Sequence, residues 1–136
     1  MHSKIVEQAH HSVHHVHALI RTLFTDANGE GQAAFEPLMS AFAEHFTMVT
    51  TSAAIVSRAM VEQMFKGAVG AKPALEIVIS DLQTVWQEGN SVAIRYKETH
   101  RLNQSESSRV SVAIIGIYHH NAQWTYLHET PVSQES

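Results

Sequence analysis

The amino-acid sequence predicts an α+β fold in which N-terminal helices pack on one face of a curved antiparallel sheet. Three observations indicate it. The first half of the chain places apolar residues at helical spacings, and residues from Ala74 onward alternate between apolar and polar. Turn-forming clusters then divide the second half into strands longer than usual. Such long strands favour a twisted, curved sheet that wraps around a cavity.

The first helix is expected over residues 3–25, with Ser3 as its N-cap. A turn-rich segment at 26–29 ends it. A second helix is expected at about 31–44, with Pro37 early in it, where proline is tolerated. Apolar residues mark the inner face of the first helix at spacings of three and four: Ile5, Ala9, Val13, Val16, Ile20 and Leu23.

A strand rich in β-branched and aromatic residues is expected at 45–51, followed by a turn and a short strand at 52–57. Ser57 is then placed to cap a third helix from Arg58 to about Val69. Four strands follow, separated by turn signals: about 74–88, 91–103, 108–119 and 123–131.

The bulk composition sets limits on the protein. A chain of 136 residues with 44% hydrophobic and 16% charged residues fits one globular domain spanning 1–136. It has no cysteine, which excludes disulfides and thiolate chemistry. A net charge of −4 argues against a nucleic-acid partner. Without a long apolar run or a signal-like N-terminus, we expect no membrane insertion and a cytoplasmic location.

The strand at 91–103 has an unusual inner face. Its alternate positions carry Val92, Ile94, Tyr96, Glu98, His100 and Leu102. A half-buried strand normally has a more uniformly apolar inner face. Tyr96, Glu98 and His100 therefore indicate either a polar pocket or a solvent-exposed end of the sheet. A hairpin centred on Ser105 and Glu106 would place Arg109 and Ser111 on the same side. In that register His100 opposes Ser111, and Glu98 opposes Ala113.

This face predicts a ligand pocket with a few polar groups on an apolar wall. Glu98 and His100 are the candidate acid–base residues, with Arg109 or Tyr96 available to stabilise an oxyanion. The alternative is structural: Glu98 forms an ion pair with Arg109, and His100 completes a network at the sheet edge. The expected pocket residues are Phe46, Met48, Phe65, Tyr96, Glu98, His100, Arg109, Ser111 and His128.

The first helix carries five of the eleven histidines within eight residues: His10, His11, His14, His15 and His17. The i, i+4 pairs among them have a spacing that can chelate a metal. A pair is only half a site, and no matching carboxylate follows at helical spacing, so we expect a solvated helix face and no metal. His17 lies nearer the apolar stripe and is expected to be half-buried beside the pocket.

The order of elements resembles the nuclear transport factor 2-like superfamily, a cone-shaped, cystatin-like fold, and most closely its SnoaL-like branch. The resemblance covers nearly the whole chain. It depends on the long first helix, the HFTMVTTSAAIVSRAMVEQMF segment, the strand with Tyr96-Lys97-Glu98 and the closing WTYLHET. Its isomerase-type members use an Asp base, which neither Asp26 nor Asp81 matches in position.

The resemblance implies three kinds of function. The first is binding of a hydrophobic small molecule, the second is an isomerase, dehydratase or cyclase reaction with Glu98 or a histidine as acid–base, and the third is a non-catalytic dimerisation or regulatory module. It also implies a homodimer formed through the open sheet face. The sequence has no nucleotide-binding motif, and we expect no cofactor. Whether the protein is an enzyme stays open at this point.

Overall fold

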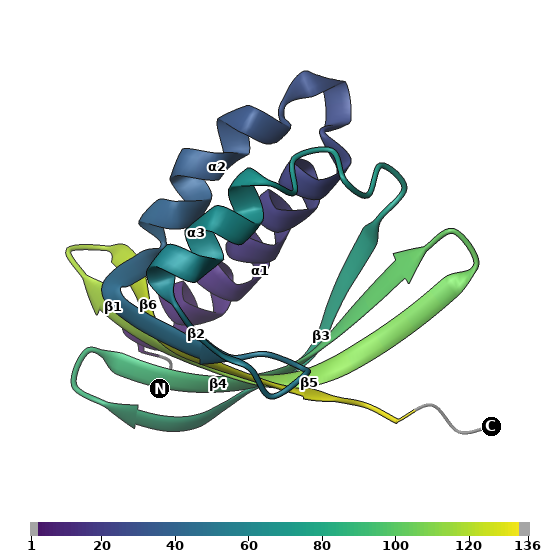
Figure 1. Cartoon of the computed structure of the whole chain (residues 1–136). Helices are drawn as coiled ribbons and strands as arrows, with labels where there is room; N and C mark the ends of the chain where they lie inside the picture. The colour runs from purple at the N-terminus through teal and green to yellow at the C-terminus, as the bar shows by residue number, and fades with distance from the viewer. Residues whose placement is uncertain (1–2, 134–136) are drawn as a thin grey trace.

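The computed structural model describes residues 3–133 and places three α-helices on one face of a curved six-stranded sheet (Figure 1). The elements, in chain order, are α1 (Lys4–Thr25), a short 3-10 turn (Ala27–Gly29), α2 (Gly31–Ser40), β1 (Phe42–Val49), β2 (Ile55–Ser57), α3 (Arg58–Lys66), β3 (Glu76–Glu88), β4 (Ser91–Leu102), β5 (Ser105–Tyr118) and β6 (Asn121–Pro131). The predicted α+β class is confirmed.

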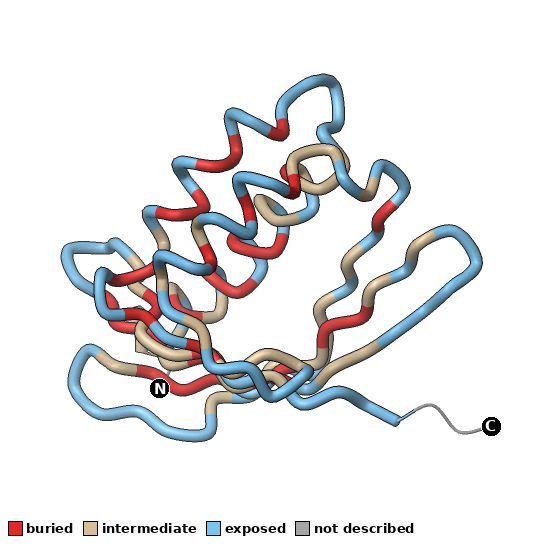
Figure 2. Tube along the Cα trace, in the orientation of Figure 1, coloured by how far each residue is buried: buried red, intermediate tan, exposed pale blue. Residues whose placement is uncertain are grey.

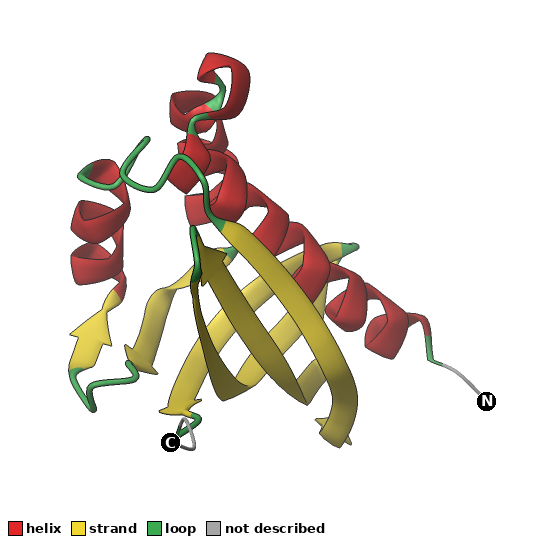
Figure 3. Ribbon diagram, turned by 90° about the vertical axis from the view of Figure 1, so that its right-hand side faces the viewer, coloured by secondary structure: helices red, strands yellow, loops and turns green. Residues whose placement is uncertain are grey.

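Helix α1 begins and ends where its sequence signals predict. The hydroxyl oxygen of Ser3 accepts a hydrogen bond from the Ile5 amide at 3.1 Å. At the other end, Asp26 adopts the left-handed conformation, with φ of 49°, and its amide bonds the Thr22 carbonyl. The face between these caps is buried against the sheet, and α1 crosses the strands diagonally (Figure 3).

Helix α2 is shorter than predicted, and β1 begins earlier than predicted. The helix ends at Ser40, and Phe42 already pairs with Trp124 of β6. The Ala41 carbonyl accepts from the Trp124 amide at 2.7 Å, so sheet pairing takes this backbone out of the helix. Helix α3 likewise ends at Lys66 rather than near Val69, followed by Gly67 at its C-cap.

The sheet order is β2-β1-β6-β5-β4-β3. The predicted antiparallel meander is confirmed for β3 through β6, but β1 pairs with β6 in parallel. Strand β3 has two register shifts, one between Ser80 and Gln83 and one between Thr84 and Trp86. Bulges of this kind bend and twist a strand. The sheet therefore curves up around the helices instead of lying flat beneath them (Figure 1).

The hydrophobic core lies between the helices and the middle of the sheet. Figure 2 shows buried segments on the helices and mid-strand, with exposed chain at the hairpin tips. Trp124 is fully buried, and its indole N–H donates to the Ser12 hydroxyl of α1 at 2.9 Å. This bond fixes α1 over β6. In the described part of the chain, no helix has both the length and the apolar character needed to cross a membrane.

Candidate functional site

A cavity of about 390 Å³ lies between the curved sheet and helices α1 and α3. Its wall is mostly apolar, as ligand pockets in proteins usually are. The apolar lining residues are Val16, Ile20, Phe24, Phe42, Met48, Val56, Met60, Val61, Met64, Phe65, Trp124 and Leu127. Met60 and Met64, on α3, are about half exposed and form part of the rim. Thioether side chains adapt readily to ligands of different shape.

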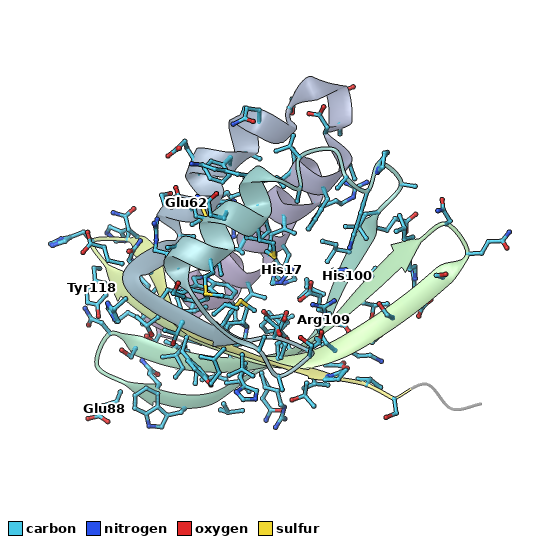
Figure 4. All side chains as sticks on the ribbon, in the orientation of Figure 1. His17, Glu62, Glu88, His100, Arg109 and Tyr118 are labelled. Carbon is cyan, nitrogen blue, oxygen red and sulfur yellow. The ribbon has the colours of Figure 1, made fainter. Side chains whose placement is uncertain are left out.

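The polar part of the lining is centred on Glu98, a carboxylate held between two histidines. His17 of α1 lies with its Nε2 3.1 Å from one carboxylate oxygen, and His100 of β4 has its Nε2 2.5 Å from the other. Both His17 and Glu98 are buried, at 4% and 3% exposure. Figure 4 shows the His17 and His100 side chains approaching each other from the helix layer and the sheet. All three residues line the cavity.

The contacts of His17 define its protonation state. Its Nδ1 lies 2.7 Å from the Val13 carbonyl, which only accepts hydrogen bonds, so Nδ1 carries a proton. Its Nε2 faces the Glu98 carboxylate, and a bond there requires either a second proton on the ring or a protonated Glu98. Burial by itself lowers the pKa of His17, but the hydrogen bond and the charge of Glu98 outweigh burial and raise it. The pair is therefore an imidazolium and a carboxylate.

Glu98 is unsuited to act as a base near neutral pH. Burial favours its neutral form, but the hydrogen bonds from His100 and His17 and their charges lower its pKa well below the ordinary value of 4.5. Both carboxylate oxygens are already engaged. Glu98 instead orients His100. With the Nε2 proton of His100 donated to Glu98, Nδ1 has no hydrogen-bond partner among residues 3–133.

A second charged pair lines the same cavity. Arg109 of β5 donates from Nη1 to a Glu129 carboxylate oxygen of β6 at 3.2 Å. Burial raises the pKa of Glu129, and the negative charge of Glu98 adds to this, although Arg109 opposes it. Glu98 and Arg109 therefore do not form the expected ion pair. Glu98 contacts His17 and His100 instead, and Arg109 contacts Glu129. Figure 4 shows Arg109 near His100, under the helices.

The β4–β5 hairpin has a different register from the predicted one. Its turn lies at Asn103 and Gln104, so Glu98 opposes Arg109, and Tyr96 opposes Ser111. The predicted pairings of Glu98 with Ala113 and of His100 with Ser111 are therefore wrong. Asn103 tolerates the positive φ of 59° that this tight turn needs. The shift moves each partner by an even number of residues, so the predicted inner face is retained.

Strand β6 contains a bulge that reverses its faces. Trp124 pairs with Ile115 but Tyr126 pairs with Ile114, which leaves Thr125 as the extra residue. After Thr125 the inward positions are Leu127 and Glu129. The predicted pocket position of His128 is therefore wrong: its ring is exposed and lies 2.8 Å from the Tyr126 hydroxyl. Without the bulge, simple alternation from Trp124 points His128 inward.

The remaining predicted pocket residues divide into two groups. Met48 and Phe65 line the cavity. Phe46, Tyr96 and Ser111 are buried, but their side chains lie in the core beside the cavity and not in its lining. The Tyr96 and Ser111 hydroxyls oppose each other across β4 and β5, and neither makes a hydrogen bond of ordinary geometry within the described chain.

The sequence did not predict the positions of two cavity residues, His17 and Glu129, correctly or in full. His17 was expected beside the pocket, but its direct contact with Glu98 was not foreseen, because that contact depends on how α1 crosses the sheet. Glu129 was not among the predicted pocket residues, since a one-residue bulge leaves no clear sequence signal.

The other histidines of α1 lie away from this cavity. His11 and His15 stack at 6.0 Å between ring centroids and border an open groove of about 1020 Å³, together with His119 and His120 of the β5–β6 turn. In the described part of the chain, no three histidine or acidic side chains are arranged to hold a metal ion.

Known structures define the class of this fold. No protein-family model and no curated protein matches the sequence. An NTF-2 like protein of unknown function from Pseudomonas aeruginosa superposes with a TM-score of 0.86 at 23% identity, over 93% of this chain and 99% of that one. The chain therefore has the nuclear transport factor 2-like fold that the sequence predicted.

More distant structures with this fold have varied descriptions. A candidate dehydratase of the NTF2-like family from Streptomyces avermitilis superposes with a TM-score of 0.65 at 15% identity, over 86% of this chain and 94% of that one. A CaMKII hub from S. rosetta gives 0.63 at 7% identity, with the same coverage. The fold is thus shared by proteins of different function, so function must be argued from the cavity.

Proposed function

We propose that the protein binds a mostly apolar small molecule in the cavity between the curved sheet and helices α1 and α3. The observation that carries this proposal is a cavity with an apolar wall and charged groups gathered at one side. Buried charges are costly to maintain, and a core that served only stability would do as well with apolar residues there. The resemblance to the SnoaL-like branch agrees with a ligand-binding role.

A thermal-shift screen with a library of apolar compounds tests the proposal, since a ligand that binds only the folded state raises the melting temperature. Met64→Trp places an indole at the cavity rim, at a position that is 52% exposed and so tolerates the larger side chain. Gln63→Trp adds the same ring to a neighbouring exposed position outside the lining. We expect hits that disappear in Met64→Trp and persist in Gln63→Trp. Equal loss in both variants, or no hits, would contradict the proposal.

A second candidate function is acid–base catalysis, and the Glu98–His100 pair favours it. Since Glu98 holds the Nε2 proton of His100, the imidazole has its Nδ1 lone pair available to take a proton from a bound molecule. The low pKa of Glu98 makes His100, not Glu98, the candidate base. The similarity to a candidate dehydratase agrees with such chemistry.

Hydrogen–deuterium exchange next to the carbonyl of a bound ketone distinguishes catalysis from binding alone. We expect wild-type protein to accelerate exchange of a ketone found in the screen, and His100→Gln to bind the ketone without accelerating exchange. Binding without acceleration by the wild type would leave ligand binding as the function and exclude this proton transfer.

We also propose that the protein forms a homodimer through the outer face of the sheet. Val78 and Val110 are exposed there, beside half-buried Val112 and Ile114. Structural neighbours described as association or hub domains agree with self-association. This proposal is independent of the cavity, since the outer face lies on the far side of the sheet from the helices (Figure 1).

A further inference from the structure

The charge of the cavity differs in sign from that of the whole chain. The protein has a formal net charge of −4. Among the charged lining residues, Lys72, Arg109 and protonated His17 carry positive charge, against Glu98 and Glu129. Three positive and two negative groups leave one net positive charge in a partly enclosed space. A low-dielectric cavity strengthens the effect of such a charge on a ligand.

Arg109 is the cation best placed to meet a ligand. The guanidinium makes one hydrogen bond, to Glu129, and its other N–H groups have no partner within residues 3–133. Its side chain is 23% exposed, in contrast to the buried His17 and Glu98. His17 already has both ring nitrogens engaged. Lys72 sits over the Phe24 ring at 5.0 Å, on the cavity lining.

We propose that the ligand is an apolar carboxylate whose head group binds the free N–H groups of Arg109 while its hydrocarbon part lies against the methionine-rich wall. This inference depends on the proposed function and names its ligand class. A guanidinium presents paired N–H groups that match a carboxylate, and such charge-assisted bonds are stronger than neutral ones. The apolar wall adds to the binding free energy, because the hydrocarbon part of the ligand is removed from water there.

Binding of an anion here also involves Glu129. Two carboxylates on one guanidinium repel each other, and Glu98 lies close enough to add to the repulsion. Glu129 therefore takes up a proton when the ligand carboxylate binds Arg109. The other charged or titratable groups around Glu129 are His17 from α1, Tyr96, Glu98 and His100 from β4, Arg109 from β5, and Lys72. Of these, His17, Arg109 and Lys72 are positively charged, and Glu98 is negatively charged.

A matched set of ligands tests the inference by calorimetry. Naphthylacetic acid, naphthylacetamide and naphthylethylamine share an apolar ring and differ in head-group charge. We expect the acid to bind wild-type protein about tenfold tighter than the amide, which corresponds to one charge-assisted hydrogen bond, and the amine to bind weakest. In buffers of different ionisation enthalpy, only the acid should show proton uptake.

Two variants isolate Arg109. Glu129→Gln removes the competing carboxylate, so the acid should bind tighter than to the wild type and without proton uptake. The double variant Arg109→Met with Glu129→Gln differs from it only at Arg109 and leaves neither partner of the pair as an unmatched buried charge. There the acid should lose its advantage over the amide. Arg101→Met, which changes an exposed arginine outside the cavity, is the control and should bind like the wild type.

The outcomes separate this inference from the proposed function. Equal binding of acid and amide would overturn the carboxylate inference and leave apolar ligand binding intact. An acid preference that survives in the double variant would overturn the role of Arg109. Failure of all three compounds, under conditions where hits from the apolar screen bind, also overturns the inference, whereas a screen without hits overturns the proposed function itself.

Discussion

At the scale of single residues, the position of one carboxylate sets the chemistry of the site. Glu98 accepts hydrogen bonds from His17 and His100, which keeps it ionised and keeps His17 protonated. The Val13 carbonyl fixes the other side of the His17 ring. This arrangement makes Glu98 a poor base, so the acid–base role that we propose as a second candidate function belongs to His100.

The His17–Glu98 pair predicts a defined pH dependence of stability. The pKa of Glu98 is lowered in the fold, so its contribution is present above the unfolded value of 4.5 and is lost as pH falls through the folded pKa. The pKa of His17 is raised, so its contribution is full below 6.5 and is lost as pH rises through the folded pKa. The pair therefore stabilises the fold most between these two values.

His17→Gln should lower the free energy of unfolding by about 3 kcal/mol in that window, as expected when one partner of a buried ion pair is removed. The deficit should shrink at higher pH, where wild-type His17 also loses its proton. Urea unfolding across pH measures it. His15→Gln changes an exposed histidine of the same helix and should have almost no effect. A deficit of constant size at every pH would contradict the ion pair.

At the scale of elements, irregular strands decide which side chains reach the cavity. The sequence predicted the inner face of β4, because strict alternation holds there. It failed in β6, where the Thr125 bulge turns Glu129 inward and His128 outward. The hairpin register was also missed, yet an even shift preserved the face. The class and order of elements were predictable, whereas contacts that depend on bulges or on helix placement were not.

The junction of α1 and α2 gives an element-scale prediction. The Gly31 amide donates to the Asp26 side chain at 2.8 Å, and a Cβ at Gly31 would lie 2.8 Å from that same oxygen and 2.9 Å from the Leu23 carbonyl. Gly31→Ala should therefore destabilise the protein by about 1–3 kcal/mol in urea unfolding. Gly67→Ala is the matched control.

At Gly67 an added Cβ meets its nearest neighbours at 3.7 and 3.8 Å, and φ is −83°. That substitution should be neutral, or stabilising by up to about 1 kcal/mol, since alanine restricts the unfolded chain. Equal destabilisation by both substitutions would show that close packing at the α1–α2 junction is not what requires glycine.

At the scale of the whole molecule, the two faces of the sheet have different surroundings. The inner face, under the helices, bears the cavity and its charges. The outer face exposes apolar side chains that we propose to be a dimer interface. Curvature links the two, because the bend that opens the cavity also leaves the outer surface convex and uncovered by any helix (Figure 3).

Val110→Asp tests the dimer proposal. A carboxylate in this face opposes association, because it and Lys97, which opposes Val110 across β4 and β5, would both lose water in the interface. We expect the wild type to sediment as a dimer and Val110→Asp as a folded monomer, measured by analytical ultracentrifugation and circular dichroism. Gln63→Asp places the same charge on exposed α3, in the helix layer, and should remain dimeric. A monomeric wild type would contradict the proposal.

The most direct test of ligand binding in the cavity uses its own methionines. Met48, Met60 and Met64 line the cavity, whereas Met39 is buried in the core outside it. Methyl-labelled methionine gives each of them a separate signal in a carbon–proton NMR spectrum. Titration with a compound from the apolar screen should shift the signals of the three lining residues in proportion to occupancy and leave that of Met39 in place. A compound that raises the melting temperature without moving those three signals would contradict binding in this cavity.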